Sequence, residues 1–182
     1  MNDPDWPVRK MDDSFERVPL YFGGADHEGT GPLCVRENPA RFAERVGSVA
    51  TASPGETAQA VTIAAEAASQ WRDLGVSARG EMMAKAWDFS DSERDALSLV
   101  LTRELGKARA DTRGELDYGI AYVEYSIAQA PTTLAEHPVT DADGRFVFRN
   151  LPYGVVAAII PWNAPLNISS TIVGPALVAG NT

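Results

Sequence analysis

The sequence predicts an α/β protein in which a layer of helices precedes the start of a parallel sheet. Three features predict this class: helical periodicity over residues 53–134, a period-two segment near 136–151, and an apolar run from Gly154 to Ile160. The run is typical of a strand buried on both faces, which needs flanking strands. Because no such strands are visible elsewhere in the 182 residues, we expect the front part of a larger domain.

Residues 1–37 have no clear periodicity and contain several prolines and glycines. They predict an extended N-terminal arm with two short strands, near Val18–Phe22 and Leu33–Glu37. Asn38-Pro39 indicates a turn, and Arg45–Ala50 is expected to be a strand on the edge of a sheet.

Helical spacing begins after these segments. Ser53 followed by Pro54 and Glu56 has the capping-box pattern of a helix start, and apolar residues then recur as far as Trp71. Gly75 indicates a stop. Further helices are expected from Ser77 to Phe89, from Asp91 or Ser92 to Leu105, and from Arg109 to Leu134. Beyond Pro138, a turn at 141–144 and alternation over Arg145–Arg149 predict a hairpin.

The most informative stretch is the end of the apolar run and the turn after it. Pro161 removes a ladder donor and ends the predicted strand, Trp162 and Asn163 lie on the turn, and Pro165 opens an apolar segment toward Gly180. Such a turn is a place to hold a ligand at the carboxyl end of a sheet. Asn163 offers neutral donors suited to a developing oxyanion. From the residues alone, capping of the next helix is favoured over catalysis by about two to one.

Composition argues against several classes of function. The net charge of −9 disfavours a nucleic-acid partner, because binding phosphates relies on Lys and Arg. No apolar run approaches the roughly 20 residues of a membrane span. The acidic start is unlike a secretory signal, so a cytoplasmic location is expected. Cys34 is the only cysteine, and His27 and His137 lie far apart with no other His or Cys near either in sequence, so no metal site is predicted.

From residue 38 onward the chain resembles the aldehyde dehydrogenase superfamily. The segments that carry the resemblance are Asn38-Pro39, Ser53–Trp71, Leu101–Lys107 (LTRELGK), Arg113-Gly-Glu115, Tyr153–Asn163 and Gly174–Thr182. Pro161-Trp-Asn163 is the specific motif. The resemblance implies an N-terminal fragment with an incomplete Rossmann-like NAD(P)-binding domain. The implied parts are an arm (1–37), the helical part of that domain (38–135), an oligomerisation-domain hairpin (136–151) and the first strand and helix of the core (152–182).

The resemblance also implies a reaction and site residues. Members oxidise aldehydes to carboxylic acids with NAD or NADP, through a cysteine thiolate that attacks the aldehyde. By position, Asn163 is the side-chain donor of the oxyanion hole, and this role then outweighs capping. Ile159, Ile160, Pro161 and Trp162 are implied to line the adenosine and nicotinamide ribose side of the cofactor. The hairpin implies a homo-oligomer in the full-length form.

Departures from the family pattern set the remaining expectations. The family's catalytic cysteine and general-base Glu have no counterpart here, and Cys34 lies far upstream, so the isolated chain is predicted to be inactive. The alternative is a non-catalytic binding or assembly module that pairs with full-length subunits. Ala164 replaces an aromatic residue of many members, which leaves room for a bulky or aromatic aldehyde unless a neighbouring side chain fills the space. Glu115 is expected near the family's monovalent-cation site or on a solvated helix face.

Overall fold

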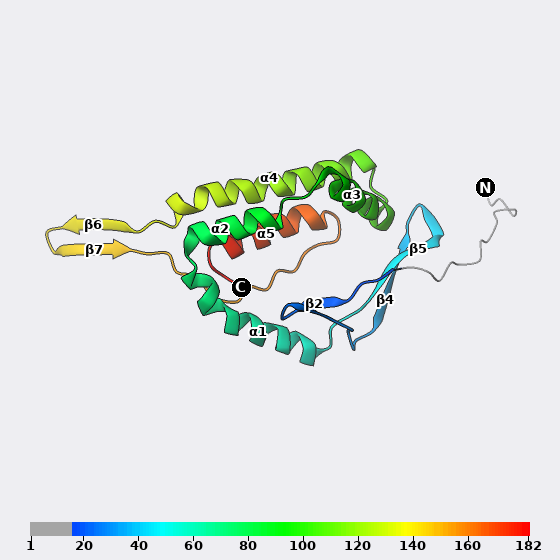
Figure 1. The fold of residues 1–182 in the computed structure, drawn as a ribbon, viewed down its shortest axis with the longest axis horizontal. Coiled ribbons are helices and arrows are strands. Elements are labelled where there is room, and N and C mark those ends of the chain that lie inside the picture. The colour runs from blue at the N-terminus through cyan, green and yellow to red at the C-terminus, as the bar shows by residue number, and fades with distance from the viewer. Residues whose placement is uncertain (1–15) are drawn as a thin grey trace, which may run out of the picture.

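The computed structural model describes residues 16–182, and the predictions for residues 1–15 of the arm lie outside this range. The elements in chain order are β1 (Glu16–Arg17), β2 (Leu20–Phe22), β3 (Ala25–His27), β4 (Leu33–Asn38), β5 (Arg41–Ala50), α1 (Pro54–Asp73), α2 (Gly75–Ala86), α3 (Asp91–Leu105), α4 (Arg109–Thr133), β6 (His137–Asp141), β7 (Gly144–Phe148) and α5 (Pro165–Val178). α4 packs along α5 and α2, and the β6–β7 hairpin extends beyond the end of α4 (Figure 1).

The N-terminal strands form two small sheets. β2 pairs with β3, and β5 is the middle strand of the order β1-β5-β4, parallel to β1 and antiparallel to β4. The predicted edge position of residues 45–50 is therefore wrong, because β5 has a partner on each side. Asn38 turns the chain between β4 and β5, since its Oδ1 accepts the Ala40 N–H at 2.9 Å.

The start of α1 follows the predicted capping signal. Ser53 Oγ accepts the Glu56 N–H at 3.4 Å, and the Glu56 carboxylate accepts the Ser53 N–H at 2.7 Å, which closes the capping box of α1. The hydrogen bonds from Ser53, the backbone bond first, lower the pKa of Glu56 to about 2. Ser90 and Glu93 repeat the arrangement at α3, which ends at Gly106 in the left-handed conformation.

α2 joins the first helix to the last. Gly75 has a φ of +80°, which interrupts α1, and α2 begins at Gly75 rather than at the predicted Ser77. Arg79 of α2 is buried, where its Nε donates to the carbonyl oxygen of Val178 at 3.0 Å and its Nη1 to that of Arg72 at 2.8 Å. One guanidinium therefore holds the ends of α1 and α5 together.

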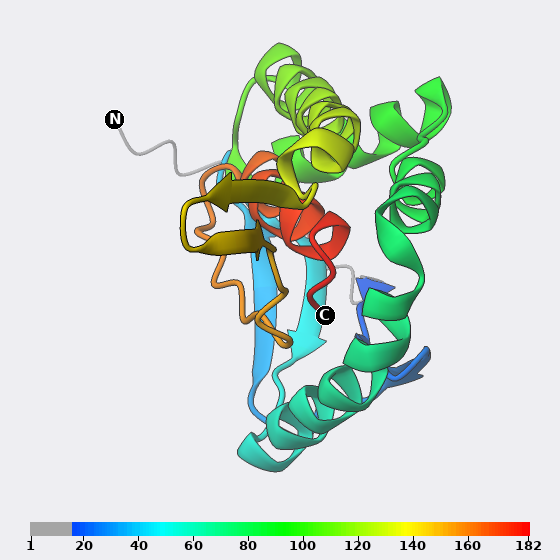
Figure 2. The same cartoon turned by 90° about the vertical axis from the view of Figure 1, so that its left-hand side faces the viewer.

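The hydrophobic core lies between α4 and α5. Val123 of α4 and Val178 of α5 are almost completely buried. The two helices approach closely because Gly174 faces Val123, and a Cβ added to Gly174 would lie 2.7 Å from Val123 Cγ2. Gly119 faces Ser170 in the same way, with an added Cβ 2.8 Å from Ser170 Oγ. Figure 2 shows α5 directly under α4 when the molecule is seen from the hairpin end.

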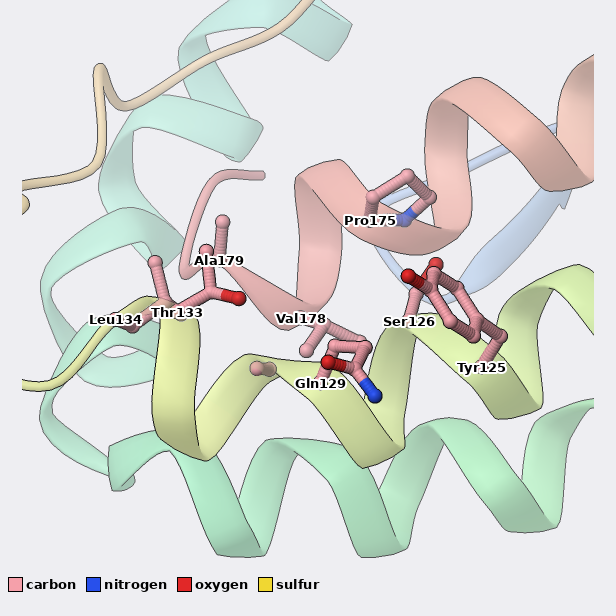
Figure 3. A pocket seen from close by; sticks show the side chains of 9 residues that line it. Tyr125, Ser126, Gln129, Thr133, Leu134, Pro175, Val178 and Ala179 are labelled. Atoms are coloured by element: carbon pink, nitrogen blue, oxygen red, sulfur yellow. The ribbon is translucent and has the colours of Figure 1, made fainter.

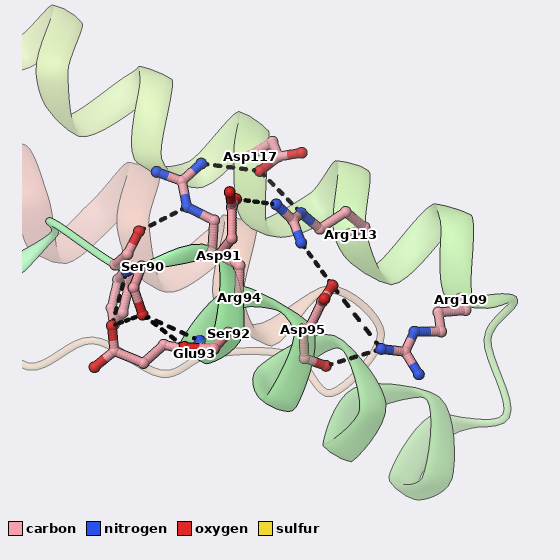
Figure 4. A network of polar contacts seen from close by, with 10 residues as sticks. Ser90, Asp91, Ser92, Glu93, Arg94, Asp95, Arg109, Arg113 and Asp117 are labelled. Carbon is pink, nitrogen blue, oxygen red and sulfur yellow. Dashed lines mark hydrogen bonds and ion pairs between the residues drawn. The ribbon is translucent and has the colours of Figure 1, made fainter.

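An ion-pair network joins α3 to α4 (Figure 4). Arg113 of α4 pairs with Asp91 at 3.0 Å, with Asp95 at 2.7 Å and with Asp117 at 3.5 Å. Arg94 of α3 pairs with Asp117 at 3.3 Å. The carboxylates are largely exposed, so each pair contributes little stability by itself, and the network mainly sets the position of α3 against α4.

The predicted hairpin is confirmed. β6 and β7 are antiparallel with His137 opposite Phe148, and Asp141 Oδ1 accepts the N–H groups of Asp143 at 2.8 Å and Gly144 at 3.2 Å in the turn. Every residue of both strands is exposed.

The run 154–160 is not a regular strand, contrary to the prediction, and its residues are exposed or half-buried. A strand needs a neighbour to bond its backbone. Within residues 16–182, the only backbone partner of this run is Thr182, which donates to the Gly154 carbonyl oxygen at 2.8 Å and accepts the Val156 N–H at 2.8 Å. This pattern matches a single parallel bridge, and one bridge does not make a strand.

Candidate functional site

Asn163 lies on the turn between the apolar run and α5. It is exposed, and its side chain makes no hydrogen bond within residues 16–182. The N-cap residue of α5 is Ala164, which has no side-chain oxygen to bond the helix. The capping role considered for Asn163 is therefore wrong, and its two N–H donors stay available to a ligand.

Glu115 of α4 caps α5 instead. Its side chain is 4% exposed. Its Oε1 accepts the N–H of Leu166 at 3.0 Å and that of Asn167 at 3.3 Å, both in the first turn of α5. These N–H groups have no partner within their own helix, and the helix dipole favours a carboxylate at that end. The alternative that Glu115 lies on a solvated helix face is therefore wrong.

Lys107, in the loop between α3 and α4, completes the arrangement. Its Nζ pairs with Glu115 Oε2 and also donates to the backbone carbonyl oxygen of Asn163 at 3.3 Å. The buried carboxylate thus has a cationic partner and two amide donors, which a buried charge requires. The sequence analysis assigned neither Lys107 nor Glu115 to the turn before α5, because their contacts to the turn and α5 span 56 and 51 residues.

The residues predicted to line a cofactor directly precede Asn163. Ile159 is 93% exposed and Trp162 is 74% exposed, while Pro161 is exposed and Ile160 is half-buried. The segment presents an uncharged apolar surface beside the Asn163 turn. Adjoining exposed apolar side chains of this size are typical of a surface to which a ligand or another segment binds.

Asn181 fixes the other end of the apolar run, a role that the sequence analysis missed. It is 7% exposed. Its Oδ1 accepts the N–H groups of Tyr153 at 2.7 Å and Gly154 at 3.2 Å, and its Nδ2 donates to the carbonyl oxygen of Ala176 at 3.0 Å. One buried amide therefore attaches the start of the run to the last turn of α5. The only sequence signal was its place in the motif at 180–182.

A groove of about 290 Å³ lies between α4 and the C-terminal half of α5 (Figure 3). Tyr125, Ser126 and Gln129 line it from α4, and Pro175 and Val178 line it from α5. Asn163 and the Glu115 contacts lie at the opposite, N-terminal end of α5, so the groove is not part of the candidate site.

Cys34 is exposed on β4. Among the residues that the structure describes, no cluster of His, Cys, Asp and Glu side chains is placed to hold a metal ion. No helix within residues 16–182 has the length and apolar character to cross a membrane.

Comparison with known proteins assigns the family. The model of the aldehyde dehydrogenase family matches residues 29–182. The alpha-ketoglutaric semialdehyde dehydrogenase of Bacillus subtilis (strain 168) is 34% identical over 154 residues, which are 84% of this chain and 32% of that protein. The chain therefore spans about a third of the length of this curated relative.

Solved structures of the same family share the fold. A putative methylmalonate-semialdehyde dehydrogenase from Sinorhizobium meliloti 1021, complexed with NAD, superimposes with a TM-score of 0.85 at 26% identity, over 94% of this chain and 35% of that one. An NADP-dependent enzyme of E. coli gives a TM-score of 0.84 at 30% identity, over 95% of this chain and 36% of that one. With most of its length matched by the family model, this chain belongs to the aldehyde dehydrogenase family.

Proposed function

We propose that the chain supplies the N-terminal portion of an enzyme that oxidises an aldehyde to a carboxylic acid with NAD or NADP. One observation carries the proposal: Lys107 holds the backbone of Asn163, while the exposed Asn163 amide has no partner within residues 16–182. A neutral donor fixed in this way can stabilise negative charge that develops on a reacting oxygen. Family membership and the semialdehyde dehydrogenases among the relatives support this reaction class.

Asn163 acts at the carbonyl oxygen of the aldehyde. When a thiolate adds to the carbonyl carbon, the oxygen gains negative charge, and Asn163 Nδ2 donates a hydrogen bond to it. The donor has no charge of its own and therefore stabilises the addition without binding the uncharged aldehyde too tightly. Cys34 is not assigned the thiolate role, because it lies on β4 in the N-terminal sheet.

The apolar surface before Asn163 fits the cofactor proposed for it. When a dinucleotide is bound, Ile159, Ile160, Pro161 and Trp162 would line its adenosine and nicotinamide ribose side, mainly through apolar and backbone contacts. A bound dinucleotide supplies the acceptor for the hydride. The NAD complex and the NADP-dependent enzyme among the similar structures support this choice.

Further parts of the proposal concern substrate, assembly and location. Ala164 beside Asn163 leaves space for a bulky or aromatic aldehyde.

The exposed hairpin supports a homo-oligomer, because an isolated two-stranded hairpin is only marginally stable in water. The acidic sequence with a single cysteine supports a cytoplasmic location.

The test uses a complete enzyme that contains residues 1–182, either native or made by joining this chain to the remaining part of the Bacillus subtilis relative. We expect Asn163→Ala to lower kcat by about 10²–10³. The matched control is Asn150→Ala, because Asn150 is an exposed amide that bonds the Thr133 carbonyl oxygen, away from the turn. An unchanged kcat for Asn163→Ala would overturn the assignment. The isolated 182-residue chain is expected to form no NADH or NADPH.

The hairpin favours a second candidate function, which is assembly without catalysis. Val139 and Phe146 are paired across the hairpin, and both are more than 40% exposed. In this case the chain alone would remain soluble with a defined mass and would bind full-length subunits. Light scattering of the isolated chain separates the two candidates, because an incomplete enzyme domain exposes apolar surface and self-associates.

A further inference from the structure

We propose that Glu115 and Lys107 are positioning residues that set the Asn163 amide against the reacting oxygen. This inference rests on the proposed function, since it concerns how the same amide is held. Both side chains come from outside the turn: Lys107 from the loop after α3, and Glu115 from α4. They form an ion pair with each other.

The contacts of Lys107 and Glu115 attach the backbone on both sides of Ala164. Lys107 Nζ binds the carbonyl oxygen of Asn163 at 3.3 Å, and Glu115 Oε1 binds the N–H groups of Leu166 at 3.0 Å and Asn167 at 3.3 Å. The chain is therefore attached before and after Ala164 to one ion pair whose carboxylate is buried. The backbone of Asn163 cannot shift relative to α5 without breaking one of these bonds.

The turn has no comparable support of its own. Ala164 at the N-cap lacks a side-chain acceptor, and the Pro that follows it has no N–H. The free donors of the first turn of α5 consequently depend on Glu115. The side chain of Glu115 is 4% exposed and that of Lys107 is 28% exposed, so solvent is largely excluded from the carboxylate but can reach the ammonium group.

Loss of this support should affect turnover more than substrate binding, because the amide acts mainly when charge develops on the oxygen. In the complete enzyme defined above, we expect Glu115→Gln and Lys107→Met to lower kcat by about 10- to 100-fold, since small displacements of a catalytic group have effects of this size. KM is expected to change by less than about threefold. Glu115→Gln removes the negative charge but keeps the shape of the side chain and one acceptor oxygen. Lys107→Met removes the positive charge but keeps an unbranched side chain.

A double-mutant cycle tests whether the effect passes through Asn163. In an Asn163→Ala background, Glu115→Gln should lower kcat by less than about threefold, because the group that it positions is already absent. If Asn163→Ala itself leaves kcat unchanged, the proposed function fails. If Asn163→Ala lowers kcat but Glu115→Gln does not, or if the two effects multiply fully, the positioning role is overturned.

A spectroscopic measurement and a control separate positioning from general loss of stability. In the NMR spectrum of the 182-residue chain, recorded below the concentration at which it self-associates, Glu115→Gln should move the amide signals of Leu166 and Asn167 upfield and accelerate their hydrogen exchange. Asp117→Asn, on the same helix, removes an exposed ion pair to Arg94 of α3 and another to Arg113 of α4, and it should leave those amides and kcat unchanged. Unchanged amide signals in Glu115→Gln, or equal changes in Asp117→Asn, would contradict the proposal.

Discussion

Asn163 differs from other asparagines of the chain in how its side chain is used. Asn38 bonds the Ala40 N–H in a turn, Asn150 bonds a carbonyl oxygen of α4, and Asn181 is buried with three backbone partners. Asn163 is exposed on a turn whose backbone is held by Lys107. A restrained backbone and a side-chain amide with no hydrogen bond within residues 16–182 support the ligand-binding role proposed for Asn163.

Ala164, the residue after Asn163, gives a prediction about substrate size. Ala164→Phe in the complete enzyme should lower kcat/KM for benzaldehyde more than for acetaldehyde, because the larger side chain would occupy space needed by an aromatic ring. The ratio of the two kcat/KM values, measured by NADH or NADPH formation, tests this. Equal losses for both aldehydes would show that Ala164 does not line the aldehyde site.

Glu56 carries a prediction about pH. Its pKa is lowered from 4.5 to about 2 by hydrogen bonds, first from the Ser53 backbone. Because the pKa of Glu56 is lower in the folded state, its ionised carboxylate stabilises the fold above pH 4.5, and this stabilisation is lost as pH falls toward 2. The free energy of unfolding of the chain, measured with urea, should decline as pH falls over this range. The free energy of unfolding of the Glu56→Gln variant should decline less. Identical pH dependence in both proteins would contradict the assignment.

At the scale of elements, the sequence predicted structures whose causes are local. The capping box at Ser53 and the turn at Asp141 act within a few residues, and the corresponding helix and hairpin are confirmed. The helix expected from Asp91 or Ser92 is also confirmed, and it begins with a capping box at Ser90 that was not predicted. The run 154–160 was predicted as a strand from its composition, but a strand depends on neighbours that lie far away in sequence. The edge position of residues 45–50 was wrong for the same reason, since β1 supplies a second partner.

The spacing of α4 and α5 gives a prediction about packing. Gly174→Ala should destabilise the chain by about 1–3 kcal/mol, because the added Cβ would lie 2.7 Å from Cγ2 of the buried Val123. The matched control is Gly114→Ala in α4, where a Cβ meets nothing within 4 Å. This control should stabilise the chain by about 0.5–1 kcal/mol through helix propensity. Urea unfolding measures both, and a neutral Gly174→Ala would refute the close approach.

At the scale of the whole molecule, the candidate site depends on contacts between distant segments. The sequence identified Asn163 through a local motif, but the cap of α5 by Glu115 and the bond from Lys107 to Asn163 span 51 and 56 residues. Residue types and helical periodicity do not encode such pairings. The fold class was accessible from the sequence, whereas the exposure of the apolar run before Asn163 and the support of the turn required the three-dimensional arrangement.

The exposed apolar surfaces predict how the isolated chain behaves in solution. Ile159 on the run, Trp162 on the turn after it and Phe148 on the hairpin are each more than 60% exposed. Light scattering of the 182-residue chain should therefore give a mass that rises with concentration above 19.5 kDa. The double variant Ile159→Ser, Trp162→Ser should lower that mass. A wild-type chain with one defined mass at all concentrations would favour the assembly module instead.

The most direct test of the role of Asn163 is a single-turnover measurement on the complete enzyme. Stopped-flow absorbance records the first formation of NADH or NADPH after an aldehyde is mixed with enzyme and cofactor, before product release can limit the rate. Asn163→Ala should slow this first turnover by about 10²–10³, while Asn150→Ala should leave it unchanged. A first turnover of Asn163→Ala as fast as that of the unmodified enzyme would contradict the role of this amide in stabilising the oxyanion.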